Sequence, residues 1–259
     1  MTRTGSISFD RAAPYYDTTR TPDEASTGRV VDLLAERFAG SGHVLEVGIG
    51  TGQVGLPLAR AGIDLIGFDL SAAMMAQLRQ KSTGDPFPLV QADAIRIPFA
   101  DRSFGGAYCR WVLHLISDWT DALEEMDRVV SPEGPIAIEP GGLSGVFADV
   151  YLRFVELLGD AVRLPGLDLI DREAQLDDAM DALGRRLADV VPVTYERKAS
   201  VAEQLDRIPT KVFAWTWDVP GGDLRAATDD VRSWAAARFD IDDPVADLPT
   251  PWRFYTRAA

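Results

Sequence analysis

The chain has 259 residues, 46% of them hydrophobic and 25% charged, and its 26 basic and 40 acidic side chains give a formal net charge of −14 with both histidines neutral. This length and composition are typical of a globular protein with one elaborated domain, and they argue against a disordered, collagenous or coiled-coil chain. The negative balance predicts no nucleic-acid partner, because a phosphate backbone is met by clustered Lys and Arg.

The sequence also argues against membranes and metals. No apolar run approaches the ~18 residues that span a bilayer, and the polar N-terminal sequence is unlike a signal peptide, so we expect no membrane partner and a cytoplasmic location. One cysteine, Cys109, allows no internal disulfide, and two histidines allow no histidine-rich metal site. A site built from carboxylates stays open, but the acidic residues are scattered as on solvated helix faces, and we predict no metal.

From residue 43 onward, apolar runs alternate with amphipathic stretches, which is the pattern of βαβ units and a mostly parallel sheet. The predicted strands are 43–48, 63–69, 88–93, 104–111 and 135–139, and the predicted helices between them are 52–62, 71–81 and a segment from 117 or 118 to 130. Beyond Glu139 the periodicity is helical until a strand-like segment at 191–199. A helix from 200, the Trp-rich FAWTW at 213–217, a helix near 223–239 and a final strand at 252–257 follow.

We therefore predict one domain over residues 1–259 rather than two independent ones. Its predicted parts are an N-terminal helical segment (1–42), a ligand-binding core (43–140), an inserted helical cap (143–190) and a C-terminal part (191–259) that completes the sheet and faces the substrate.

The strongest motif is LEVGIGTGQVG at 45–55, a buried strand followed by Gly48, Gly50 and Gly52 and then a helix. Glycines permit a tight turn and a close ligand approach, and the helix N-terminus offers N–H groups to a negatively charged moiety. A dinucleotide fingerprint that starts at Gly48 would need glycine where Gln53 stands. A nicotinamide-dependent oxidoreductase is therefore a disfavoured alternative, and the ending of a phosphate-binding P-loop is absent as well.

Four further motifs follow in order: GFDLS around Asp69, QADA around Asp93, SFGGAYCRWVLHLISD at 103–118 and LEEMDRVVSPEGPIAIEP at 123–140. With the leading FDRAAPYYDTTR at 9–20, these motifs resemble the class I S-adenosylmethionine-dependent methyltransferases, especially the small-molecule group related to ubiquinone and menaquinone methyltransferases. Ordered motifs at compatible spacing are far more specific than a glycine loop alone. The resemblance implies an α/β fold with a Rossmann-like, doubly wound, seven-stranded, mostly parallel sheet whose final strand is antiparallel.

The resemblance departs from the family pattern at two places, Gly105 in place of an aspartate and Gly134-Pro135 in place of Gly-Gly. Both concern local backbone packing and leave the implied cofactor site intact.

The resemblance implies S-adenosyl-L-methionine as the cofactor, with Asp69 on the ribose hydroxyls, Asp93 on the adenine amino group, and Tyr16 and Arg20 over the carboxylate. The other implied cofactor-binding residues are Glu46, Gly48, Gly50, Gly52, Leu70, Met74, Ala94 and Arg110. Some of these residues have a second interpretation. Gly48, Gly50 and Gly52 could only serve a tight turn between strand and helix. Asp69 could cap the second helix, a role for which Ser71 competes, and Met74 could belong to the core.

Other candidates concern the acceptor. His114 follows the fourth strand at the ligand-binding edge, where it could act as a general base or only support the turn. Trp111, Trp215 and Trp217 are predicted on the substrate side. The last two could stack on a flat substrate or contact the sulfonium, or could pack half-buried.

The predicted function is methyl transfer, by in-line displacement, to O, N or C of a small-molecule acceptor that is partly apolar. Cys109-Arg110-Trp111-Val112 stands where related enzymes that methylate amides or base amines carry a Pro-Pro-Tyr type motif, which disfavours those acceptors. The alternative is a non-catalytic regulatory protein that binds S-adenosylmethionine, in which large side chains near Arg110, Trp111 and His114 would block the substrate cavity. The acceptor and the oligomeric state stay open.

Overall fold

The computed structural model describes residues 5–20, 23–82, 86–195, 199–245 and 249–257. Parts of the predicted N-terminal segment (1–4 and 21–22) and of the predicted strand 191–199 (196–198) lie outside the described residues.

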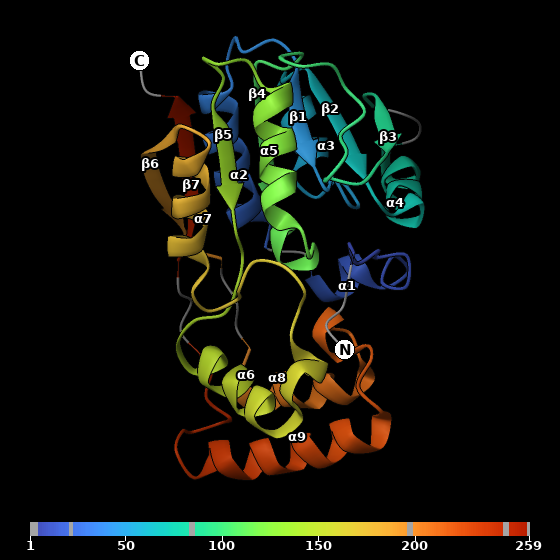
Figure 1. The fold of residues 1–259 in the computed structure, drawn as a ribbon. Helices are drawn as coiled ribbons and strands as arrows, with labels where there is room; N and C mark the ends of the chain where they lie inside the picture. The colour runs from blue at the N-terminus through green and yellow to red at the C-terminus, as the bar shows by residue number, and fades with distance from the viewer. Residues whose placement is uncertain (1–4, 21–22, 83–85, 196–198, 246–248, 258–259) are drawn as a thin grey trace.

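A seven-stranded sheet with the order β3-β2-β1-β4-β5-β7-β6 occupies one half of the molecule (Figure 1). The strands β1 to β5 pair in parallel, and β7 is antiparallel to both β5 and β6. The predicted Rossmann-like, doubly wound sheet with an antiparallel final strand is confirmed. The strands are β1 (Val44–Val47), β2 (Leu65–Asp69), β3 (Leu89–Gln91), β4 (Gly106–Arg110), β5 (Ile136–Glu139), β6 (Arg185–Val193) and β7 (Thr250–Arg257).

Helices cover both faces of this sheet. α5 (Trp119–Val129) and α7 (Arg172–Ala182) pack on one face, and α2 (Glu24–Arg37), α3 (Gly55–Arg60) and α4 (Ala72–Ser82) pack on the other. Side chains alternate along a strand. Leu45 and Val47 therefore pack in the core beneath α5 and α7, while Val44 packs in the core beneath α2, α3 and α4. Burial on both faces is why the central strands have continuous apolar sequences.

A helical layer lies beyond the carboxyl ends of the parallel strands (Figure 1). We use this name for α6 (Gly145–Leu158), α8 (Val201–Arg207) and α9 (Gly221–Ala236), which share a third core with the 3-10 helices η2 (Gly159–Val162) and η3 (Ile208–Thr210). A capping box starts α8, where Ser200 and Glu203 exchange side-chain-to-backbone hydrogen bonds. The short helix α1 (Tyr16–Arg20) lies between this layer and the sheet, where it can contribute to a site.

The structure differs from the predicted boundaries after Glu139. Of the segment 143–190, α6 joins the helical layer, but α7 packs on the sheet and β6 starts at Arg185. The strand predicted at 191–199 is therefore wrong in its position. Residues such as Arg186, Leu187 and Ala188 favour helix, and pairing with β7 overrides that preference. Pro192 is tolerated because β6 is an edge strand.

Among the described residues, no helix is both long and apolar enough to cross a membrane. Within the same residues, no group of three or more His, Cys, Asp or Glu side chains could hold a metal ion.

Candidate functional site

The loop between β1 and α3 turns at the carboxyl edge of the sheet. Gly48, Gly50 and Gly52 have left-handed φ angles of 73°, 54° and 74°. A Cβ atom at Gly48 would lie 2.4 Å from a methyl group of Val112, which follows β4, so both the conformation and the space there require glycine. Gly50 directs its N–H at a side chain of the neighbouring strand, where it donates to Oδ2 of Asp69 at 2.8 Å.

Asp69 ends β2 and is held by backbone donors. Its Oδ1 accepts from the N–H of Ser71 at 2.8 Å, and Oγ of Ser71 accepts from the N–H of Met74 at 3.1 Å. Ser71 therefore caps α4, while Asp69 fixes the turn before it. Burial raises the pKa of Asp69, and its hydrogen bonds from Ser71 and Gly50 oppose that shift. The carboxylate is thus positioned at the edge where β1 and β2 end.

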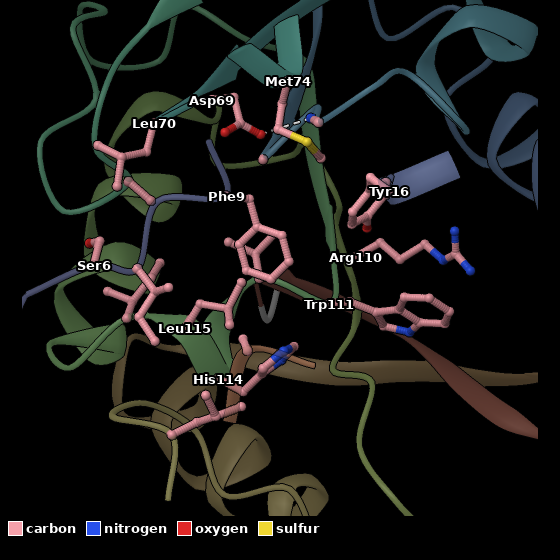
Figure 2. Close-up of a pocket in the computed structure, with 18 of the residues that line it drawn as sticks. Ser6, Phe9, Tyr16, Asp69, Leu70, Met74, Arg110, Trp111, His114 and Leu115 are labelled. Carbon is pink, nitrogen blue, oxygen red and sulfur yellow. Dashed lines mark hydrogen bonds between the residues drawn. The ribbon is translucent and has the colours of Figure 1, made fainter. Parts of the chain in front are cut away.

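A cavity of about 240 Å³ opens at this edge, between the strand ends, the N-terminal segment 5–20 and the helical layer (Figure 2). The strand order reverses at β1, and such switch points are where doubly wound sheets bind ligands. The predicted site residues that line the cavity are Tyr16, Arg20, Gly48, Gly50, Asp69, Leu70, Met74, Asp93, Ala94, Arg110, Trp111, His114 and Trp215.

The structure does not bring Glu46, Gly52 or Trp217 to the cavity wall. A Cβ atom at Gly55 would lie 2.3 Å from Oε2 of Glu46, so this carboxyl points beneath the loop toward α3. Its burial raises the pKa of Glu46 to about 8. Trp217 donates its indole N–H to the carbonyl of Lys211 at 2.9 Å and packs on the ring of Phe9 at 5.0 Å. The Trp217 side chain therefore supports the N-terminal segment.

Sequence reasoning missed Glu139 and Tyr195, which form a buried group with the predicted site residues Arg110 and Trp111. We call these four residues the Glu139 cluster. Glu139 is 0% exposed, and its carboxylate accepts at 2.8 Å from Nε of Arg110, from Nε1 of Trp111 and from the Tyr195 hydroxyl. The guanidinium lies 3.8 Å from the centre of the Trp111 ring. Nη2 of Arg110 is buried without a hydrogen-bond partner among the described residues. The cluster therefore fixes one edge of the guanidinium of Arg110, a residue that lines the cavity, and leaves one of its N–H donors without a partner among the described residues.

His114 lies on η1 (Leu113–Leu115), directly after β4, and its side chain points into the cavity (Figure 2). The pKa of His114 is lowered to about 4, mainly by burial and also by the positive charge of Arg20, while a backbone hydrogen bond with Pro140 acts in the opposite direction. The imidazole is therefore neutral at pH 7. The N–H groups of Gly166 and Leu167 donate to the carbonyls of His114 and Leu113 at 3.2 Å each, which fixes the turn.

The N-terminal segment closes one wall of the cavity. Ser6 donates from Oγ to Oδ1 of Asp93 at 2.8 Å, and Oδ1 of Asp10 accepts from Oγ of Ser71 at 2.6 Å. At its other end, Nη2 of Arg20 donates to the carbonyl of Val212 at 2.9 Å. Ser6 and Phe9 also line the cavity, and no periodicity in the sequence identifies them. Only the acidic residues of this segment could have indicated its contacts with helix N-termini.

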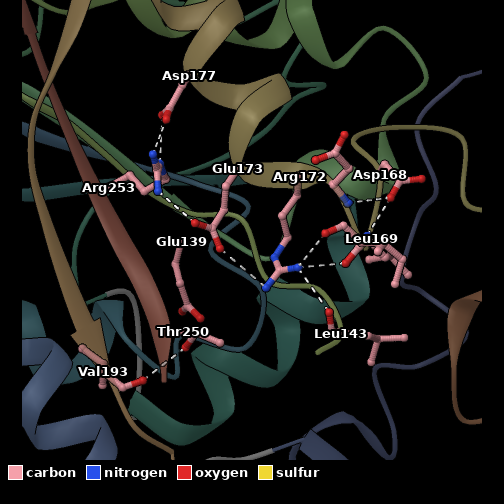
Figure 3. A network of polar contacts seen from close by, with 12 residues as sticks. Glu139, Leu143, Asp168, Leu169, Arg172, Glu173, Asp177, Val193, Thr250 and Arg253 are labelled. Atoms are coloured by element: carbon pink, nitrogen blue, oxygen red, sulfur yellow. Dashed lines mark hydrogen bonds and ion pairs between the residues drawn. The ribbon is translucent and has the colours of Figure 1, made fainter. Parts of the chain in front are cut away.

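Two loops form the opposite wall, and Arg172 joins them from behind (Figure 3). Its Nη1 donates to the carbonyls of Leu143 and Leu169 at 3.2 and 3.0 Å, and Leu143 N–H donates to the Leu169 carbonyl at 3.0 Å. Leu143 and Leu169 line the cavity, and Arg172 is 7% exposed. Glu173 and Asp177 of the same helix pair with Arg253 of β7, which anchors the two loops to the sheet.

Comparison with known proteins identifies relatives of this architecture. Residues 45–138 match the family described as Methyltransferase domain. A demethylmenaquinone methyltransferase of Renibacterium salmoninarum is 31% identical over 156 residues, which cover 57% of this chain and 63% of that protein. A malonyl-[acyl-carrier protein] O-methyltransferase of Enterobacter lignolyticus is 32% identical over 130 residues, which cover 50% of each protein. The chain thus matches between half and two thirds of the length of these relatives.

Among solved structures, the cyclase SpnF aligns over 99% of this chain and 100% of its own, with a TM-score of 0.64 and 19% identity. This similarity shows a shared fold. It leaves the chemistry to be argued from the site.

Proposed function

We propose that this chain, a member of the class I S-adenosylmethionine-dependent methyltransferases, binds S-adenosyl-L-methionine at the carboxyl edge of β1 and β2 and transfers its methyl group to a small-molecule acceptor. The observation that carries the proposal is the pair formed by Asp69 and Gly50. The carboxylate ends β2, accepts the Gly50 N–H of the glycine loop, and faces the cavity at the switch point of the sheet. A ribose with two hydroxyl donors suits a carboxylate held in this way.

The residues present fit the cofactor at both of its polar ends. Asp93 and Ala94 stand beyond β3, on the side of the cavity proposed for the adenine, next to Leu70 and Met74. At the other end, the buried and unpartnered Nη2 of Arg110 supplies a donor for a carboxylate, and Tyr16 and Arg20 line the same region. Glu46 and Gly52 support the loop from behind, so we propose them as structural residues and not as cofactor contacts.

S-adenosylmethionine supplies a methyl group that is already activated by a positively charged sulfur. The tasks left to this chain are to bind, to align the acceptor with the methyl group and to keep water out. Phe9 of the N-terminal segment lines the cavity, as do Phe213 and Trp215, which pack against the core of the helical layer. These apolar side chains suit water exclusion. Trp111 lines the cavity too, but Glu139 holds its indole N–H, so we propose that it contacts the acceptor through its ring.

The alternative, a non-catalytic regulatory protein, predicts a substrate cavity blocked by large side chains near Arg110, Trp111 and His114. Instead, all three of these residues line the cavity, together with Leu143, Leu169 and Phe213. Proposed cofactor-binding residues and proposed acceptor-side residues thus share one cavity, which favours an enzyme. Demethylmenaquinone and malonyl-[acyl-carrier protein] are the acceptors that the names of two relatives give, and they differ in chemistry. The family therefore leaves the acceptor to be identified.

The test is calorimetric titration of the purified chain with S-adenosylmethionine and with S-adenosylhomocysteine, with NADH as a negative control. We expect micromolar affinity for both adenosyl compounds and none for NADH. A folded protein that binds neither adenosyl compound would contradict the proposal. A screen over phenols, quinols, amines and carboxylates with isotopically labelled methyl donor then detects transfer, and binding without transfer to any class would favour the regulatory protein.

A further inference from the structure

We propose that Glu139 and Tyr195 are positioning residues for cofactor binding. They hold the guanidinium of Arg110 so that its unpartnered Nη2 binds the carboxylate of S-adenosylmethionine, and they thereby set how strongly the chain prefers ligands that carry this carboxylate. Neither Glu139 nor Tyr195 lines the cavity, and both act through Arg110, which does. The inference rests on the proposed function, and it gives two residues behind the site a part in ligand selection.

The first support is the way in which the guanidinium of Arg110 is held. Its Nε donates to the Glu139 carboxylate at 2.8 Å, and its central carbon lies 3.8 Å from the centre of the Trp111 ring and 5.0 Å from that of Tyr195. These two rings are in edge contact, with centres 5.9 Å apart. Aromatic contacts restrict a planar guanidinium, and the bond from its single Nε–H to Glu139 selects one orientation.

Tyr195 in turn holds Glu139. The Tyr195 hydroxyl donates at 2.8 Å to Oε2, the same oxygen that accepts from Arg110, while Oε1 accepts from the indole N–H of Trp111. The carboxylate, whose side chain is 0% exposed, cannot rotate without breaking at least one of these bonds. Removal of the Tyr195 hydroxyl should therefore loosen Arg110 and still leave the ion pair in place.

The second support is the donor that remains. Nη2 of Arg110 is buried and has no hydrogen-bond partner among the described residues. Burial acts to lower the pKa of Arg110, but the charge of Glu139 acts in the opposite direction and the pKa is raised, so the guanidinium stays charged. A buried, charged N–H is costly without an acceptor, and a carboxylate is a strong one. Arg20, which also lines the cavity, already donates to the Val212 carbonyl.

The third support is the backbone that follows Arg110. Trp111 has a left-handed φ of 58°, which is strained in a residue with a Cβ atom. Glu139 holds Trp111 there twice, because its carbonyl accepts the backbone N–H at 3.0 Å and its Oε1 accepts the indole N–H at 2.8 Å. Strain of this kind persists where the surroundings impose it, and it is typical of functional sites. Glu139 therefore fixes the backbone next to Arg110 as well as its side chain.

The experiment compares two ligands that differ only in the carboxylate: S-adenosylhomocysteine and its decarboxylated form, in which hydrogen replaces that group. Calorimetry gives the ratio of their affinities, which we call the carboxylate preference. A general loosening of the structure weakens both ligands and keeps the ratio, whereas displacement of Arg110 lowers it. We expect a preference of about 10- to 100-fold in the unaltered protein, the effect of a charge-assisted hydrogen bond.

Glu139→Gln keeps the side-chain volume and removes the charge, and it should lower the carboxylate preference about three- to tenfold. Arg110→Met removes the donor and should lower the preference by about tenfold. When Glu139→Gln is added to Arg110→Met, the preference should change by less than about twofold, because the residue that Glu139 positions is gone. Tyr195→Phe removes only the hydroxyl and should lower the preference about two- to fivefold. It carries the test if Glu139→Gln does not fold.

Glu156→Gln is the matched control. Glu156 also pairs with an arginine, Arg153 at 2.9 Å, but its side chain is 64% exposed on α6, so this change should keep the preference. The inference is overturned if folded Glu139→Gln or Tyr195→Phe keeps the full preference, if Glu139→Gln lowers it equally in the absence of Arg110, or if the unaltered protein binds both ligands alike. Absence of S-adenosylhomocysteine binding to the unaltered protein would instead contradict the proposed function, so the two failures are distinguishable.

Discussion

The carboxylate of Glu139 lies 2.8 Å from Nε of Arg110, and the parallel pairing of β4 with β5 places the two residues side by side at the strand ends. Their side chains are 0% and 8% exposed, respectively. A buried guanidinium that loses its carboxylate keeps its desolvation cost without compensation, so such pairs are strongly coupled.

We expect Glu139→Ala to lower the free energy of unfolding by about 3–5 kcal/mol, because it leaves Arg110 unpaired and removes the acceptor of Trp111 and Tyr195. Urea denaturation at pH 7 measures the loss. The double variant Arg110→Met with Glu139→Leu removes both charges and should recover at least half of it. If the loss of unfolding free energy in the double variant equals the sum of the losses in the two single variants, the pair is not coupled as described.

Asp69→Asn tests the proposed cofactor site. The change keeps the size of the side chain, but an amide cannot accept two hydroxyl donors as an ionised carboxylate does, so the affinity for S-adenosylhomocysteine should fall by about 10- to 100-fold. Calorimetry measures the change. Asp64→Asn, at the start of the same strand region but 62% exposed, is the control and should bind normally. Unchanged affinity in Asp69→Asn would refute the ribose assignment.

Gly48→Ala tests the turn of the glycine loop. Alanine at this position would have to adopt a left-handed backbone conformation, and its Cβ atom would lie 2.4 Å from a methyl group of Val112. We therefore expect the free energy of unfolding to fall by about 2–4 kcal/mol. Thermal or urea unfolding measures it. Gly62 also has a positive φ, 94°, but a Cβ atom there would have no neighbour within 4 Å. Gly62→Ala should therefore lower the free energy of unfolding only through backbone strain, by about 1 kcal/mol. Val112→Ala added to Gly48→Ala should relieve the clash, and the absence of any relief would locate the strain elsewhere.

Glu46→Gln tests the buried carboxyl beneath the loop through its pH dependence. Burial raises the pKa of Glu46 from 4.5 to about 8, so between these values the folded protein keeps a proton that the unfolded chain has released. The group's contribution to stability is therefore present below pH 4.5 and is lost as the pH rises toward 8.

From pH 5 to pH 7 the unaltered protein should lose stability relative to Glu46→Gln by about 3 kcal/mol at most, since the amide does not titrate. Urea unfolding curves at several pH values measure the difference. Glu133→Gln, at an exposed position, is the control, and its stability should change with pH as that of the unaltered protein does. If the unaltered protein instead gains stability relative to Glu46→Gln as the pH rises, the folded state stabilises the carboxylate form, and the prediction is wrong.

The sequence predicts most of the sheet because its signals are local. β1, β2, β4 and β5 are runs of apolar residues, the pattern typical of strands that are buried on both faces of a sheet. Their predicted positions agree with the structure within one or two residues. Asp69 and Gly50 belong to consecutive βα units, and the parallel order of such units brings their carboxyl ends together. For this reason the sequence alone could place them at one edge.

Side-chain direction was decided by tertiary structure. Trp215 and Trp217 look equivalent in FAWTW, but the 3-10 helix η4 (Ala214–Thr216) gives them different directions. Trp215 lines the cavity, whereas Trp217 packs on Phe9 and donates to the Lys211 carbonyl. Glu46 precedes the glycine loop in sequence and yet points away from the cavity, because successive residues of a strand face opposite sides of the sheet.

The sequence by itself determined the order of the βα units, the glycine loop and the acidic residue that follows it, since each depends on residues close together in the chain. Only the tertiary structure decided the rest: the strand β6, the closure of the cavity by residues 5–20, and the meeting of Arg110 with Glu139. Each of these depends on contacts between segments far apart in the chain, whose free energy is gained by packing and by paired burial of polar groups. The local secondary-structure propensity of a segment contains no information about such contacts.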